Sequence, residues 1–116
     1  MSQSDFDREI LERLGYCIDS ALGFFGTNVK KAVYWDFETE YGMSKDKIPL
    51  HISEFVSLLR GMFGPQASLL VERKIMREII SEFQLSPKNY PTIDLPRLVN
   101  ELLNLNNDIP DRAETK

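Results

Sequence analysis

Apolar residues recur every three or four positions in five segments of this 116-residue chain, and polar residues fill the positions between them. This spacing matches the 3.6-residue turn of an α-helix and places the apolar side chains of each segment on one face. Helices are therefore predicted at residues 5–22, 27–42, 51–63, 65–84 and 94–106. The short apolar runs all lie inside these longer periods, so the pattern predicts an all-α bundle of about five helices with no sheet.

Glycine, proline and small polar residues mark the ends of several predicted helices. Thr27 is suited to cap the second helix, and Gly42 is suited to the left-handed conformation that often ends one. Gly64 and Pro65 separate the third helix from the fourth, because proline is tolerated in the first turn of a helix but not inside it. Asp94 or Thr92 provides a cap for the last helix.

The remaining segments are predicted to be connections or tails. Residues 43–50 form a polar connection, and Ile48 is predicted to be extended because a following proline disfavours helix. Residues 1–4 and the polar segment 107–116 are predicted to be disordered, which leaves a single helical domain at residues 5–106.

Charge and cysteine content narrow the function classes. The net charge of −4 and the isoelectric point of about 5.0 argue against a dedicated nucleic-acid binder, which normally carries an excess of positive charge. The single cysteine cannot form an internal disulfide, so a reducing, cytoplasmic setting is expected. The first residues lack the basic and apolar blocks of a signal peptide, and no apolar run is long enough to cross a membrane.

The predicted helix at residues 27–42 carries two apolar faces, although a small domain needs only one for its core. At 100° per residue, the first face consists of Val33, Tyr34, Phe37 and Tyr41. Ala32 and Trp35 fall on roughly the opposite face, beside Lys31. Trp35 is the only tryptophan in the chain, and tryptophan is enriched among the residues that dominate protein interfaces.

Two interpretations of Trp35 remain open at this point. In the first, Trp35, Ala32 and Lys31 belong to a surface that binds another protein or a second copy of the chain. In the second, Trp35 packs beneath the last helix or the N-terminal helix, because a central helix in a bundle can be covered on two sides.

Glu72 lies in the middle of the apolar stripe of residues 65–84, between Leu69 and Ile75. A carboxylate at such a position is costly unless it is paired or hydrogen-bonded. It could act as an acid of raised pKa or as a recognition group. Alternatively, it could form a structural pair with one of the nearby polar candidates, which are Lys30, Lys31, Arg60 and Tyr34.

A second possible binding surface is basic. It would combine two predicted helices and consist of Lys30, Lys31, Arg73, Lys74 and Arg77. Such a patch could bind nucleic acid or an acidic partner. Glu78 and Glu82 interleave with the basic residues, and Glu78 can pair with Lys74 at a four-residue spacing, so a solvated charged face is the alternative.

No catalytic, metal or cofactor site is predicted. His51 is the only histidine and Cys17 the only cysteine, whereas zinc and iron sites normally need several such ligands. The sequence contains no nucleophile elbow, Walker pattern or dinucleotide fingerprint. Binding is therefore favoured over chemistry.

A series of short motifs in the middle of the chain resembles a known family. In order, the motifs are Gly26-x-x-Val29-Lys30-Lys31-Ala32-Val33-Tyr34, Tyr41-Gly42, Asp46-x-Ile48-Pro49, Phe63-Gly64-Pro65-x-Ala67 and Glu72-x-x-Ile75. The series resembles the archaeal Nitrosopumilus output domains of the fifth type, over about residues 20–83. One departure is Gln66, which stands where the family's pattern has a second glycine.

This resemblance implies an intracellular output module of archaeal signal transduction with no known catalytic residues. It also implies that Glu72 and the turn at Phe63-Gly64-Pro65 belong to a shared scaffold, while Trp35 and the last helix are more individual to this chain. The sequence thus favours a non-enzymatic interaction or output module acting through the second helix. The alternative is a nucleic-acid-binding regulator that uses the basic face.

Overall fold

The computed structural model describes residues 3–86 and 94–107, which form four α-helices and one 3-10 helix. In chain order the elements are α1 (Gln3–Phe24), α2 (Thr27–Tyr41), η1 (Lys45–His51), α3 (Ile52–Glu82) and α4 (Leu95–Asn107). The described residues contain no strand, and the predicted all-α fold is confirmed. The described residues have four α-helices where about five were predicted, because α3 contains two of the predicted helices, which meet at Gly64.

The joint inside α3 is a kink at Gly64. The backbone angles of Gly64 are φ 85° and ψ 162°, which lie outside the helical region and favour glycine. The next residue, Pro65, has no backbone N–H to donate to the preceding turn. Gly64-Pro65 therefore interrupts the helix at the predicted boundary and leaves two helical arms, residues 52–63 and 65–82, that meet at a kink.

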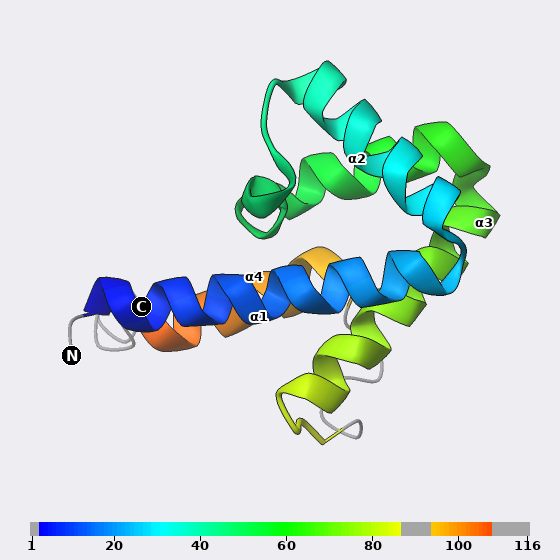
Figure 1. Ribbon diagram of the computed structural model, residues 1–116. Coiled ribbons are helices and arrows are strands. Elements are labelled where there is room, and N and C mark those ends of the chain that lie inside the picture. Colours follow the sequence, from blue (N-terminus) through cyan, green and yellow to red (C-terminus); the bar gives the residue numbers. More distant parts are fainter. Residues whose placement is uncertain (1–2, 87–93, 108–116) are drawn as a thin grey trace, which may run out of the picture.

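The two arms of α3 give the molecule its shape (Figure 1). α1 and α4 lie side by side and run in opposite directions, while the first arm of α3 lies beneath α2 and the second arm crosses α1. The core between them is built from apolar side chains of every element, including Leu14 and Ile18 of α1, Phe55 and Ile79 of α3, and Leu98 of α4. Packing these amphipathic faces together supplies most of the stability.

The structure corrects the prediction that residues 43–50 form an irregular polar connection. Ile48 and Pro49 belong to the 3-10 helix η1 and are buried, with Ile48 only 1% exposed. The local preference of a residue before proline was outweighed by the burial of Ile48 in the core, which is worth about 1.5–3 kcal/mol.

Apart from Gly64-Pro65, helix ends follow the sequence at two of the three other predicted positions. Gly42 adopts the left-handed conformation (φ 68°, ψ 24°), and its N–H donates to a carbonyl one turn earlier at 2.8 Å. The side chain of Asp94 accepts a hydrogen bond from the N–H of Arg97 at 3.0 Å, as a helix cap does. Thr27, however, is the first residue of α2, and the capping position is occupied by Gly26 without a side-chain bond.

The second arm of α3 buries a different set of residues at its start than the sequence predicted. Leu69, which was predicted to face the core, is 41% exposed. Ser68 and Val71 are buried instead, in register with Ile75 and Ile79. These four residues follow a three- and four-residue spacing, whereas Leu69 lies about 100° away from it around the helix.

The structure also bears on the termini and on membranes. α1 already includes Gln3 and α4 extends to Asn107, whereas the predicted disorder at residues 1–2 and 108–116 lies outside the described residues. Within the described ranges, no helix has the length and apolar character needed to cross a bilayer.

Candidate interaction surface and cleft

The two faces of α2 are as the sequence predicted. Val33 and Phe37 are fully buried, and Tyr34 and Tyr41 are half-buried against the core. On the opposite side, Trp35 leaves 68% of its surface exposed, and Ala32 is exposed beside it. α2 is therefore attached to the domain by one face and presents the lone tryptophan on the other.

The exposed face of α2 is open because of how the other helices pack. α2 packs mainly against α1, η1 and α3, while α4 packs mainly against α1 and α3 and lies behind α1 in Figure 1. The second interpretation, in which Trp35 is covered by another helix of the chain, does not hold for the described residues. We define the outer face of α2 as the exposed residues Lys31, Ala32, Trp35, Glu38 and Thr39.

Aromatic contacts hold α2 firmly on its inner side. The Phe37 ring meets the Phe55 ring of α3 edge-on, with ring centres 6.1 Å apart, and lies 5.4 Å from the Tyr41 ring. The Tyr41 hydroxyl donates a hydrogen bond to the backbone carbonyl of Glu54 at 3.2 Å. These contacts attach the inner face of α2 to the domain and leave its outer face free of them.

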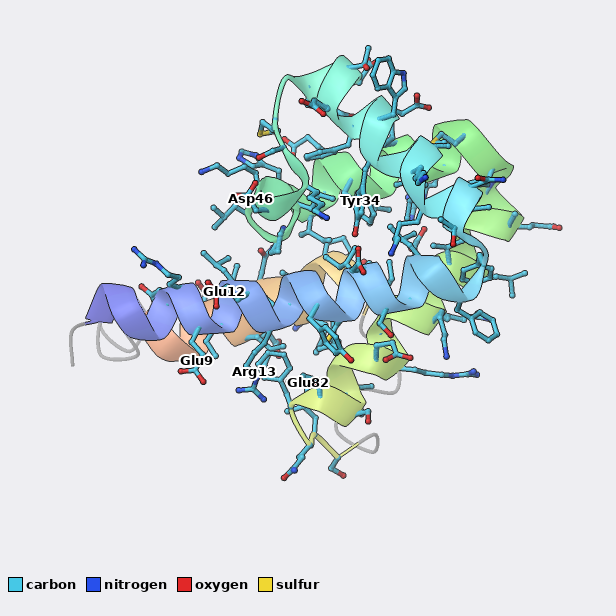
Figure 2. All side chains as sticks on the ribbon, viewed as in Figure 1. Glu9, Glu12, Arg13, Tyr34, Asp46 and Glu82 are labelled. Carbon is cyan, nitrogen blue, oxygen red and sulfur yellow. The ribbon has the colours of Figure 1, made fainter. Side chains whose placement is uncertain are left out.

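A polar cluster joins α2 to α1. The Tyr34 hydroxyl donates to Oδ1 of Asp19 at 3.0 Å, and Nζ of Lys30 donates to Oδ2 at 3.1 Å. Figure 2 shows Tyr34 reaching from α2 towards α1. Partial burial by itself raises the pKa of Asp19, but the hydrogen bonds and the positive charges of Lys30 and Lys45 outweigh burial and hold this pKa below its usual 3.8. Burial and the neighbouring Asp19 together raise the pKa of Tyr34.

The lowered pKa of Asp19 predicts a pH dependence of stability. A carboxyl group whose pKa is lower in the folded state stabilises the fold above its unfolded pKa of 3.8, and the stabilisation is lost as the pH falls through the folded value. Asp19→Asn should therefore lower the free energy of unfolding at pH 7, by no more than about 1 kcal/mol because the Asp19 side chain is 40% exposed. Urea unfolding of both proteins between about pH 7 and pH 2 measures the difference, which should shrink below about pH 4. A difference that stays constant over this range would contradict the role of Asp19.

Next to this cluster, a cleft of about 550 Å³ separates α1 from η1. Its lining includes Gly15, and outside the helix's own backbone no atom of another residue lies within 4 Å of the position that a Cβ of Gly15 would take. Glu12 of α1 and Asp46 of η1 approach it from opposite sides (Figure 2). The volume suits a small ligand.

The walls of the cleft do not select a class of ligand. They carry cations and anions in equal number, namely Arg8, Lys45, Lys47, Glu12, Asp19 and Asp46. Both carboxylate oxygens of Asp19 already accept hydrogen bonds from the protein, and Asp46 accepts one from Ser44. The bonds of Asp19 join α1 to α2, and the bond of Asp46 lies at the start of η1.

Glu72 is buried, as the sequence predicted, and its partners bridge the kink of α3. Only 4% of its surface is exposed. Its Oε2 accepts a hydrogen bond from the Ser68 hydroxyl at 2.6 Å and lies 3.4 Å from Nε of Arg60. Arg60 belongs to the first arm and Glu72 to the second, so this contact supports a structural role for the carboxylate.

The single histidine, His51, lies 4.0 Å from a carboxylate oxygen of Glu54.

The five basic residues proposed for nucleic-acid binding are only partly free. Lys30 pairs with Asp19 at 3.1 Å, and Lys74 pairs with Glu78 at 3.2 Å. Nζ of Lys74 also lies 4.4 Å from the centre of the Phe24 ring, close to the C-terminal end of α1. The exposed members of the set without such a pair in the described residues are Lys31, Arg73 and Arg77.

The sequence did not reveal the contact that fastens the C-terminal end of α3. Arg13 of α1 donates to the side chain of Glu82 at 3.2 Å and to its backbone carbonyl at 3.0 Å, and its guanidinium lies 4.2 Å from the centre of the Phe83 ring. Figure 2 shows Arg13 and Glu82 together on the side of α1 opposite the cleft. The residues are 69 positions apart, so no local spacing could signal the pair.

Cys17 is buried in the same region and is chemically protected. Only 1% of it is exposed, and its Sγ lies 3.5 Å from the carbonyl oxygen of Glu78. Burial, together with the negative charges of Glu82 and Glu78, raises the pKa of the thiol to about 12. A thiol in this state is a poor nucleophile and metal ligand at neutral pH.

Comparison with known proteins identifies no relative from which the role of this surface could be inferred. No protein family, no curated protein and no solved structure matches the chain. The resemblance to archaeal output domains is therefore carried only by the short motifs between Gly26 and Ile75. The outer face of α2 is the main structural indication of function.

Proposed function

We propose that this chain is a non-enzymatic interaction module whose binding surface is the outer face of α2. The observation that carries the proposal is the 68% exposure of Trp35, the only tryptophan, on a helix whose other face is anchored in the core. Burying the rest of this side chain in an interface would contribute on the order of 2–4 kcal/mol, which is typical of residues that dominate binding.

The surroundings of Trp35 support an interface more than a solvated face. Ala32 and Thr39 are small, so a partner could approach the tryptophan ring closely on that side. Lys31 and Glu38 flank the ring on the other side and provide opposite charges. An aromatic centre with a charged margin is the usual composition of a specific interface.

The resemblance to archaeal output domains supports the same proposal from another direction. An output module without catalytic residues transmits a signal by binding. We propose the role in signal transduction and the cytoplasmic location on this ground. The nucleic-acid alternative is weaker, because ion pairs offset two of the five basic residues and the net charge is −4.

The test is capture of partners with the wild-type chain and with Trp35→Ala as bait, from an extract of the source cell that also contains untagged copies of the chain. Trp35→Ala should weaken association by at least about 2 kcal/mol, a factor of roughly 30 in Kd, so captured proteins should be lost. The substitution should leave the fold intact, because the ring contributes little to the core.

Phe24→Ala is the matched control. Phe24 is 69% exposed, close to the value for Trp35, but it lies at the end of α1 and outside the outer face of α2. It should retain the same proteins as the wild type. If Trp35→Ala captures the same set as the wild type, untagged copies included, the outer face of α2 is not the binding surface.

A further inference from the structure

The outer face of α2 is self-complementary, and this property indicates what it binds. Its charged residues are separated along the helix, with Lys31 four positions before Trp35 and Glu38 three positions after it. At a rise of 1.5 Å per residue they lie about 6 Å and about 4.5 Å from the level of Trp35, in opposite directions. The positive and negative positions are thus nearly equidistant from the tryptophan.

The two charges also lie on the same edge of the face. At 100° per residue, Lys31 and Glu38 lie about 40° and about 60° to one side of Trp35, whereas Thr39 and Ala32 lie at similar angles to the other side. All four residues are exposed. One edge is therefore charged, and the other consists of small side chains.

We propose that two copies of this chain associate by packing their α2 helices antiparallel about a twofold axis at Trp35. Lys31 of each copy then pairs with Glu38 of the other. This inference rests on the proposed function and names the partner as a second copy. A twofold axis that reverses the helix direction keeps each edge of one helix against the same edge of the other, so the charged edges meet and the small edges meet.

The antiparallel direction follows from the charges. In this arrangement Lys31 of one copy and Glu38 of the second copy lie at nearly the same height on the same edge, and the pair occurs twice. In a parallel arrangement the twofold axis would place the charged edge of each copy against the small edge of the other, so Lys31 and Glu38 would find no opposite charge there. The helix dipoles also oppose each other favourably in the antiparallel pair.

Nothing in the described residues competes for these charges. Lys31 and Glu38 take part in none of the ion pairs formed within residues 3–86 and 94–107, in contrast to the neighbouring Lys30, which is held by Asp19. On the small edge, Ala32 and Thr39 leave room for the two tryptophan rings to stack with an offset.

The size of the contact sets the expected strength. α2 has 15 residues and is about 22 Å long. One pair of such helices buries less than the 1,200–2,000 Å² or so of a standard stable interface. The dimer should therefore be weak, forming in the micromolar range and exchanging readily.

The experiment is a charge exchange on the full chain. Molar mass is measured by light scattering after size exclusion, from low to high micromolar protein, together with the emission wavelength of Trp35. The wild type should form a dimer, and the emission should shift to shorter wavelength as the ring leaves water. Lys31→Glu and Glu38→Lys should each weaken the dimer at least about tenfold, because both create two like-charge contacts.

The decisive sample is an equal mixture of Lys31→Glu and Glu38→Lys. Each charge of one variant then meets the opposite charge of the other, so a mixed dimer should form with an affinity within about threefold of the wild type. Glu40→Lys is the matched control, because it changes the charge of α2 equally but lies about 140° from Trp35. It should dimerise as the wild type does.

The possible failures separate this inference from the proposed function. A wild type that is monomeric throughout overturns the dimer, and the Trp35-dependent capture of partners from the cell extract then still decides the proposed function. A dimer that Trp35→Ala weakens, but that neither charge reversal affects or that the mixture does not restore, overturns the antiparallel arrangement only. A dimer that is indifferent to Trp35→Ala forms through another surface and overturns this inference, and the Trp35-dependent capture of other proteins then still decides the proposed function.

Discussion

Phe37→Ala is expected to destabilise the protein by about 3–5 kcal/mol, a large part of the 5–15 kcal/mol or so that holds a domain of this size together. Phe37 is fully buried, and its ring contacts both Phe55 and Tyr41. Removing the ring deletes apolar contacts and leaves a cavity between α2 and α3 that the backbone can only partly close. The loss should appear as a lower urea midpoint in equilibrium unfolding followed by circular dichroism.

Trp35→Ala is the control for this prediction. It removes a larger ring only two residues away on the same helix, yet it should change the free energy of unfolding of the monomer by no more than about 0.5 kcal/mol. Measurements at low protein concentration keep dimer formation out of the comparison. Equal losses for Phe37→Ala and Trp35→Ala would show that both faces of α2 are packed, which would remove the basis for a binding surface there.

Glu72→Ala is expected to cost about 2–3 kcal/mol, the second largest effect. The substitution leaves the Ser68 hydroxyl, which is fully buried, without its acceptor, and it opens a cavity at the kink of α3. It also removes the only carboxylate in the described residues that pairs with Arg60 across that kink. Urea unfolding at neutral pH measures the loss.

A double-mutant cycle separates the partners of Glu72. Ser68→Ala and Glu72→Ala should be strongly non-additive, because each removes the same buried hydrogen bond. Arg60→Ala should cost less than about 1 kcal/mol, since its side chain is 53% exposed and solvent screens the pair. Additive effects of Ser68→Ala and Glu72→Ala would mean that the hydrogen bond between them contributes little.

Features that depend on local periodicity could be predicted from the sequence. The two faces of α2, the left-handed glycine at position 42 and the cap at Asp94 all follow from relations within about one or two helical turns. In the same way, Glu72 could be recognised as a buried carboxylate because it interrupts an apolar stripe. Arg60 was one of four candidate partners, and only the folded chain singled it out.

Features that depend on distant contacts could not be predicted. Ile48 lies in a 3-10 helix, although a residue before proline prefers an extended conformation, because burial of its side chain in the core outweighs that preference. Leu69 is exposed, whereas Ser68 and Val71 are buried at the position where Leu69 was expected. The reason is that the kink at Gly64 sets the angle at which the second arm meets α1. Arg13 and Glu82 are too far apart in the chain for any spacing rule to connect them.

Trp35 shows the same division within a single residue. The sequence by itself determined that Trp35 lies on the side of its helix opposite the core face, because a helix of 3.6 residues per turn allows no other direction. Only the tertiary structure decided that this side stays open. α4 packs mainly against α1 and α3 and leaves the outer face of α2 uncovered, and that placement depends on the summed burial of the whole core.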